Sequence, residues 1–88
     1  MKAFAIEEEF LGHEAVSRLW KKQRKEMFAS PEADLAKVTR ADSSAVALLI
    51  KWAKARREQG GKLICHNTPA QLKALIKMYG ATDLMDLG

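Results

Sequence analysis

Cysteine and long apolar runs are both scarce in this sequence. Cys65 is the only cysteine among 88 residues, so an internal disulfide is excluded and a reducing compartment is favoured. No apolar run approaches the roughly 20 residues that a membrane-spanning helix needs. The first ten residues, MKAFAIEEEF, carry three glutamates where a signal peptide would have its apolar stretch. We therefore expect a cytoplasmic protein.

Recognisable catalytic and cofactor motifs are also missing. There is no GxGxxG or Walker A pattern to hold a nucleotide phosphate. The neighbours Cys65 and His66 have only the distant His13 as a further ligand, too few for the four ligands typical of zinc. No nucleophile elbow surrounds Ser43, and Glu7, Glu8 and Glu9 would alternate sides in a strand. We expect no enzymatic activity, no cofactor and no metal.

The net charge of +4 and the pI near 9.4 raise the question of an anionic partner. The densest basic run, residues 21–25, is bordered by Glu26 and lies inside a helical pattern. A solvated helix face explains this run more simply than a nucleic-acid or anionic-lipid site does. We expect no nucleic-acid partner.

The first half of the chain predicts a strand, a helix and a second strand. Residues 2–8 contain a short apolar run and predict the first strand. From His13, one face of a helix is indicated by spacings of three and four between Val16, Leu19, Trp20, Gln23 and Met27. Pro31 ends that helix at Ser30, and residues 33–38 predict the next strand.

The second half repeats this order. Asp42, Ser43 and Ser44 are good helix-capping residues and precede an apolar run, so a helix is predicted to begin there and to end at Gly60-Gly61. Residues 62–66 predict a strand. The segment 68–71 (TPAQ) predicts a capped helix start with Thr68 as N-cap, Pro69 in the first turn and Gln71 closing a capping box. The apolar stripe of this last helix is Leu72, Leu75, Ile76 and Tyr79, and Gly80 ends it.

Alternating strands and helices predict a single α/β domain over residues 1–88. Its strands should be mostly parallel and joined by right-handed crossovers, with helices packed mainly on one face of a small sheet. The residues that we expect to be largely buried are Leu19, Leu35, Leu48, Leu49, Leu63, Leu72 and Ile76.

Asp42-Ser43-Ser44 is the remaining candidate site. Helix capping alone explains these residue types. A functional interpretation rests on their position, because sites in α/β sheets favour the loops that follow strands. A hydroxyl exposed there, at the positive end of a helix, can hold a phosphate or an acidic group of a partner. Both interpretations stay open on local physics.

The segment Val38–Leu49 (VTRADSSAVALL) resembles the signature turn and helix of STAS domains. The resemblance covers about residues 14–85 and is strongest over 38–80. One branch, the MlaB-type subunits of phospholipid-transport ABC systems, is more similar still. The segments that carry this similarity are Trp52-Ala53, Arg56-Arg57, Gly60–Leu63, Asn67–Leu72 and Met78–Gly80.

The resemblance implies a STAS-like fold and a function in protein binding. An MlaB-type domain docks on the ATPase subunit of its ABC transporter, supports its assembly and activity, and is peripherally associated with the inner membrane through that partner. Relatives that regulate sigma factors use the hydroxyl after the aspartate as a phosphorylation switch, which here would be Ser43. The partner-binding residues implied by the resemblance are Thr39, Arg40, Asp42, Ser43 and Ser44.

Two departures from the family pattern have structural consequences. Ala45 and Val46 stand where the family has glycine before the apolar run, and the added methyl group is expected to alter how closely a partner approaches. A STAS domain opens with two strands, whereas this sequence has room for only one before His13, so the first edge strand is predicted to be absent. An edge exposed at Phe4, Ala5 and Ile6 would favour a homodimer through the N-terminal strand.

Overall fold

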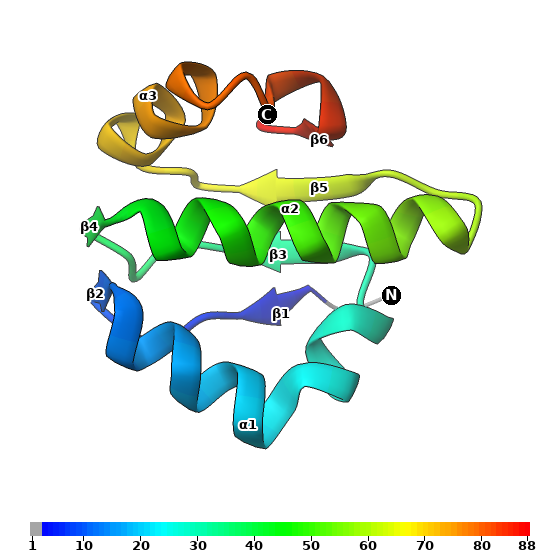
Figure 1. Cartoon of the computed structure of the whole chain (residues 1–88), viewed down its shortest axis with the longest axis horizontal. Coiled ribbons are helices and arrows are strands. Elements are labelled where there is room, and N and C mark those ends of the chain that lie inside the picture. Colours follow the sequence, from blue (N-terminus) through cyan, green and yellow to red (C-terminus); the bar gives the residue numbers. More distant parts are fainter. Residues whose placement is uncertain (1–2) are drawn as a thin grey trace.

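The structure is a computed structural model that describes residues 3–88. Three helices alternate with short strands (Figure 1). The elements are β1 (Phe4–Ala5), β2 (Phe10–Leu11), α1 (His13–Ala29), β3 (Glu32–Asp34), β4 (Arg40–Ala41), α2 (Ser43–Glu58), β5 (Leu63–His66), α3 (Ala70–Met78), the 3-10 turn η1 (Thr82–Leu84) and β6 (Met85–Asp86). The predicted helix starts near residues 13 and 43 are confirmed, and the third helix begins at Ala70.

All strand pairs in the described chain are parallel, as the alternating pattern predicted. The main sheet has the order β1-β3-β5-β6, and β2 pairs with β4 in a second, two-stranded sheet. Helix α2 lies across β3 and β5, with α1 and α3 on its two sides (Figure 1). The fold is therefore the small α/β arrangement with a helical layer on one face that was expected.

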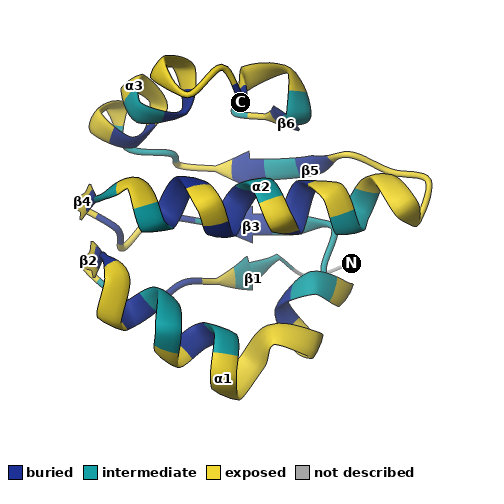
Figure 2. Cartoon of the chain, in the orientation of Figure 1, coloured by how far each residue is buried: buried dark blue, intermediate teal, exposed yellow. Residues whose placement is uncertain are grey.

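Strand side chains show which face the helices cover. Ala33 is paired with Cys65, Leu63 is paired with Met85, and all four are buried. The intervening pairs, Glu32 with Ile64 and Asp34 with His66, are half-buried or exposed. On the helical side, buried residues recur along α2, which lies over these strands (Figure 2). The core thus lies between one face of the sheet and the three helices.

The residues predicted to be buried all lie in this core. Leu19 is the most accessible of them at 7%, and Leu35, Leu49, Leu63, Leu72 and Ile76 are fully buried. Trp52 is the largest fully buried side chain, and its ring nitrogen donates a hydrogen bond of 3.0 Å to the Ser30 carbonyl. Tyr79, predicted on the apolar stripe of α3, is instead 55% exposed because it follows the last residue of that helix.

The strand predicted over residues 33–38 is wrong beyond Asp34. The carboxylate of Asp34 accepts a hydrogen bond of 3.0 Å from the Ala36 backbone N–H, which turns the chain out of the sheet. This hydrogen bond lowers the pKa of Asp34, and a second one of 3.2 Å, donated by the Asn67 side-chain nitrogen, lowers it further. Leu35 and Val38 are nevertheless buried, so the apolar pattern identified core residues rather than strand length.

The N-terminal segment also differs from its prediction over residues 2–8. The strand covers only Phe4–Ala5, and residue 2 lies outside the described part of the chain. Two strands precede His13 rather than one, although the second, β2, belongs to the other sheet. Strand β1 is the edge strand of the main sheet, because within residues 3–88 no further strand pairs with its outer side. This agrees with the prediction that the usual first edge strand is absent. The boundaries 1–88 of a single domain stay a prediction.

Candidate functional site

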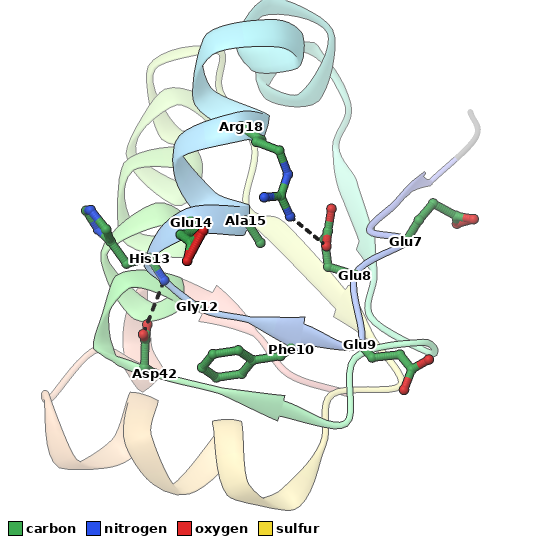
Figure 3. A pocket seen from close by; sticks show the side chains of 10 residues that line it. All are labelled: Glu7, Glu8, Glu9, Phe10, Gly12, His13, Glu14, Ala15, Arg18 and Asp42. Carbon is green, nitrogen blue, oxygen red and sulfur yellow. Dashed lines mark hydrogen bonds and ion pairs between the residues drawn. The ribbon is translucent and has the colours of Figure 1, made fainter.

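Asp42 joins the first turns of two helices. Its Oδ1 accepts a hydrogen bond of 2.8 Å from the Ser44 N–H and caps α2. Its Oδ2 accepts a hydrogen bond of 3.2 Å from the His13 N–H at the start of α1, where Gly12 itself provides no side-chain cap (Figure 3). Both helices present their positive ends to this carboxylate. The turn between β4 and α2 is therefore fixed to α1 as well.

Gly12 allows this close approach. A Cβ atom at Gly12 would lie 2.6 Å from the Phe10 ring and 3.2 Å from Oδ2 of Asp42. The ring of Phe10 lies beside this segment and is 54% exposed, with the Arg40 guanidinium 5.6 Å from its centre. A side chain at position 12 would displace the exposed Phe10 ring and crowd the Asp42 carboxylate by a few tenths of an ångström.

Gln71 fixes the same turn from the other side. Its side-chain oxygen accepts a hydrogen bond of 2.9 Å from the Ala41 N–H, and its side-chain nitrogen donates one of 2.8 Å to the Ala41 carbonyl. The predicted capping box at α3 is therefore wrong, because Gln71 binds β4 instead of its own helix end. Thr68 is not the N-cap either: Pro69 occupies that position, and the buried Thr68 hydroxyl has no partner among residues 3–88.

The predicted partner-binding residues lie together on this turn. Thr39, Arg40 and Ser43 are exposed, while Asp42 and Ser44 are half-buried. The Thr39 hydroxyl donates to the Glu9 carbonyl at 3.2 Å, which holds β4 against the segment before β2. Ser43 is the first residue of α2, and Asp42 rather than Ser43 provides the cap. Capping alone therefore explains Asp42 but not the exposed hydroxyl of Ser43.

Ala45 and Val46 do not reach the surface of this turn. They are 0% and 2% exposed and pack into the core. A direct contact of either side chain with a partner at this surface is therefore not expected, and an effect of the added methyl group on the approach of a partner stays a prediction.

An acidic pocket borders the turn on the side of β2. Figure 3 shows its lining residues, which come from the segment before β2, from β2 itself, from the first turns of α1 and from the turn before α2. They are Glu7, Glu8, Glu9, Phe10, Gly12, His13, Glu14, Ala15, Arg18 and Asp42. Two of these carboxylates have ion partners: Glu8 contacts Arg18 at 3.0 Å, and Glu7 contacts Lys37 at 2.8 Å. The hydrogen bond to Glu7 and its charge raise the pKa of Lys37.

An apolar groove borders the turn on the other side, between α1 and α2. We call it the Trp20 groove; it has a volume of about 290 Å³ and is lined by His13, Val16, Ser17, Trp20, Lys21, Ser44, Ala47, Leu48 and Lys51. The half-buried Trp20 ring has two cations over it, Arg24 at 4.7 Å and Lys51 at 5.6 Å. The sequence placed Trp20 on a helical stripe, but the pairing of α1 with α2 that forms the groove had no local signal.

No group of three or more His, Cys, Asp or Glu side chains within residues 3–88 could hold a metal ion. Cys65 is a core residue, as predicted, and burial raises the pKa of its thiol to about 12. Within the same residues, no helix has the length and apolar character needed to cross a membrane. The turn is held by hydrogen bonds from Asp42 and Gln71 and presents the exposed hydroxyl of Ser43.

The comparison with protein families gives a match over most of the chain. The family model described as "Mlab, STAS domain" matches residues 10–86, which include every element from β2 to β6. No curated protein matches the sequence.

Proposed function

This chain belongs to the STAS domain family of the MlaB type, and from that premise we propose that it is a non-enzymatic protein-binding subunit. Its partner is the ATPase subunit of a phospholipid-transport ABC complex. Docking supports assembly and activity of that ATPase, and it holds the domain at the cytoplasmic side of the inner membrane through its partner alone.

The exposed Ser43 on a fixed turn is the observation that carries this proposal. Asp42, Gln71 and the pairing of β2 with β4 hold the backbone on both sides of the turn before any partner arrives. A surface that is already ordered has less conformational entropy to lose when it binds. Such a turn suits constitutive docking.

The surroundings of Ser43 support a protein partner over a small ligand. Thr39 and Arg40 are exposed on the strand before it, and Ser44 leads into the Trp20 groove. Together they form a continuous surface from β4 to the second turn of α2. Arg40 and, in the groove, Trp20 belong to the residue types that are enriched at protein interfaces.

Co-expression with the ATPase subunit from the same organism tests the proposal. The tagged domain should retain the ATPase through gel filtration, and the complex should hydrolyse ATP faster than the ATPase alone. Recovery of the two proteins in separate peaks, with no effect of the domain on hydrolysis, would reject this partner.

The alternative function is an anti-anti-sigma switch regulated by phosphorylation of Ser43. The exposure of this hydroxyl favours it, since a kinase needs access. A phosphate there would add about two negative charges beside the Asp42 carboxylate. Mass spectrometry of the protein from its own cells distinguishes the two functions: a stoichiometric, growth-dependent phosphate on Ser43 supports the switch, and its constant absence supports docking.

A homodimer through the β1 edge stays a prediction. Ile6 donates its backbone N–H to the Asp34 carbonyl at 3.0 Å, so this segment is ordered against its own chain while its outer side stays open. Sedimentation of the pure protein over a range of concentrations tests the prediction. A dimer that dissociates on dilution is expected, and a monomer throughout would contradict it.

A further inference from the structure

The Trp20 groove combines an apolar floor with a cationic rim. Val16, Trp20 and Ala47 form part of the floor, and Lys21 and Lys51 lie at its two sides. Arg24 continues the rim one turn further along α1, over the Trp20 ring. In the described chain no acidic side chain lines the groove. Lys21 and Lys51 therefore border the groove, and Arg24 lies over its Trp20 ring, with no carboxylate in the groove lining itself.

The charge of the whole molecule is also uneven, with the positive charge concentrated on the helices, two of which form the groove. The three helices carry 11 of the 15 Lys and Arg residues and 3 of the 11 Asp and Glu residues, a net charge of +8. The rest of the chain carries the other 4 basic and 8 acidic residues, a net charge of −4. An acidic partner is thus attracted to the helical side, where the groove lies, and repelled from the acidic pocket.

The dimensions of the groove fit a helix. Its lining runs from His13 to Lys21 on α1 and from Ser44 to Lys51 on α2. Eight helical residues span about 12 Å, which is two turns of a helix lying alongside. A helix of that length presents two or three apolar side chains on one face at spacings of three and four residues.

We propose that the Trp20 groove binds an acidic amphipathic helix of the partner protein. The apolar face of that helix packs on Trp20, Val16 and Ala47, and its flanking carboxylates pair with Lys21, Arg24 and Lys51. The proposal rests on the proposed docking function, because Ser44 belongs both to the docking turn and to the groove. It adds the chemistry of the partner element, which the docking function leaves open.

A pair of model peptides tests the charge requirement on the intact protein. The first is a helical peptide of about 14 residues, four turns, with leucines on one face and glutamates beside them. The second carries lysines in place of the glutamates. Iodide quenching of tryptophan fluorescence is the measurement, because this anion collects near the cations around Trp20, while Trp52 is fully buried and inaccessible.

The glutamate peptide should protect Trp20 from iodide, and the lysine peptide should not. The double variant Arg24→Glu/Lys51→Glu should weaken binding of the glutamate peptide about tenfold and bind the lysine peptide instead. Lys54→Glu is the matched control, since Lys54 is exposed on α2 but does not line the groove. Trp20→Phe removes the iodide-quenchable part of the fluorescence, leaves that of the buried Trp52, and so shows that the protected signal comes from Trp20.

The outcomes separate this inference from the docking function. Protection by both peptides alike, or by neither, would overturn the inference. ATPase binding that is unchanged by Arg24→Glu/Lys51→Glu would also overturn it and leave the docking function standing. Selective binding of the glutamate peptide without any binding of the ATPase would support the groove inference and reject the proposed partner.

Discussion

Helices α2 and α3 begin in different ways. The first turn of α2 is capped by Asp42, and the same carboxylate also holds α1. The first turn of α3 has no side-chain cap, and the nearby Thr68 hydroxyl is buried without a partner in the described chain. Gln71, which could cap α3, instead binds both polar atoms of the Ala41 backbone. The turn that presents Ser43 is thus held by hydrogen bonds from Asp42 and from Gln71 of α3, whereas the start of α3 has no side-chain cap of its own.

The largest effect is expected from Asp42→Ala, because it removes caps from two helices at once. Each cap contributes about 1 kcal/mol, so the free energy of unfolding should fall by about 2 kcal/mol in urea denaturation. Asp42→Asn is the informative control: its amide oxygen can still accept the Ser44 N–H, so about half the loss should remain. Equal stability of Asp42→Ala and the unmodified protein would show that the turn is held by other contacts.

A smaller effect is expected from Gln71→Ala. The change removes two hydrogen bonds to Ala41, and a loss of about 1 kcal/mol in the free energy of unfolding should follow. Amide exchange at Ala41 should accelerate, since its N–H loses its acceptor. Gln23→Ala, at an exposed position of α1, should change stability by less than about 0.5 kcal/mol. Indistinguishable results for the two variants would contradict the role given to Gln71.

The smallest effect, and one of opposite sign, is expected from Thr68→Val. The change replaces a buried hydroxyl that has no partner by a methyl group of similar size. Stability should stay the same or rise by up to about 0.5 kcal/mol in the same denaturation experiment. A loss above about 1 kcal/mol would mean that the Thr68 hydroxyl does make a stabilising contact.

Local patterns predicted the three helices and a cap within Asp42–Ser44, because capping and periodicity act over a few residues. They could not predict that Asp42 also binds His13, 29 positions away, or that Gln71 binds Ala41, 30 positions away. A glutamine three residues after a threonine gives the same sequence pattern whether its side chain caps its own helix or hydrogen-bonds the backbone of a strand. Only the packing of α3 beside β4 decides between these partners.

Of the candidate site, the sequence predicted the turn but not the Trp20 groove, because only the turn is formed by residues that are neighbours in sequence. Thr39, Arg40, Asp42, Ser43 and Ser44 are neighbours in sequence, so the turn and its family resemblance identified them together. The Trp20 groove requires α1 and α2 to lie side by side, and the basic run beside Trp20 is equally typical of a solvated helix face.

Binding of the ATPase to Ser43→Glu is the most direct test of docking through this turn. The variant places a charged, bulkier side chain on the exposed first residue of α2, where a negative charge does not harm the helix. Thr82→Glu is the matched control, with the same charge at an exposed hydroxyl residue in η1. We predict that Ser43→Glu retains its denaturation midpoint but binds the ATPase about tenfold more weakly, while Thr82→Glu binds normally. Full binding by Ser43→Glu would contradict docking at this turn.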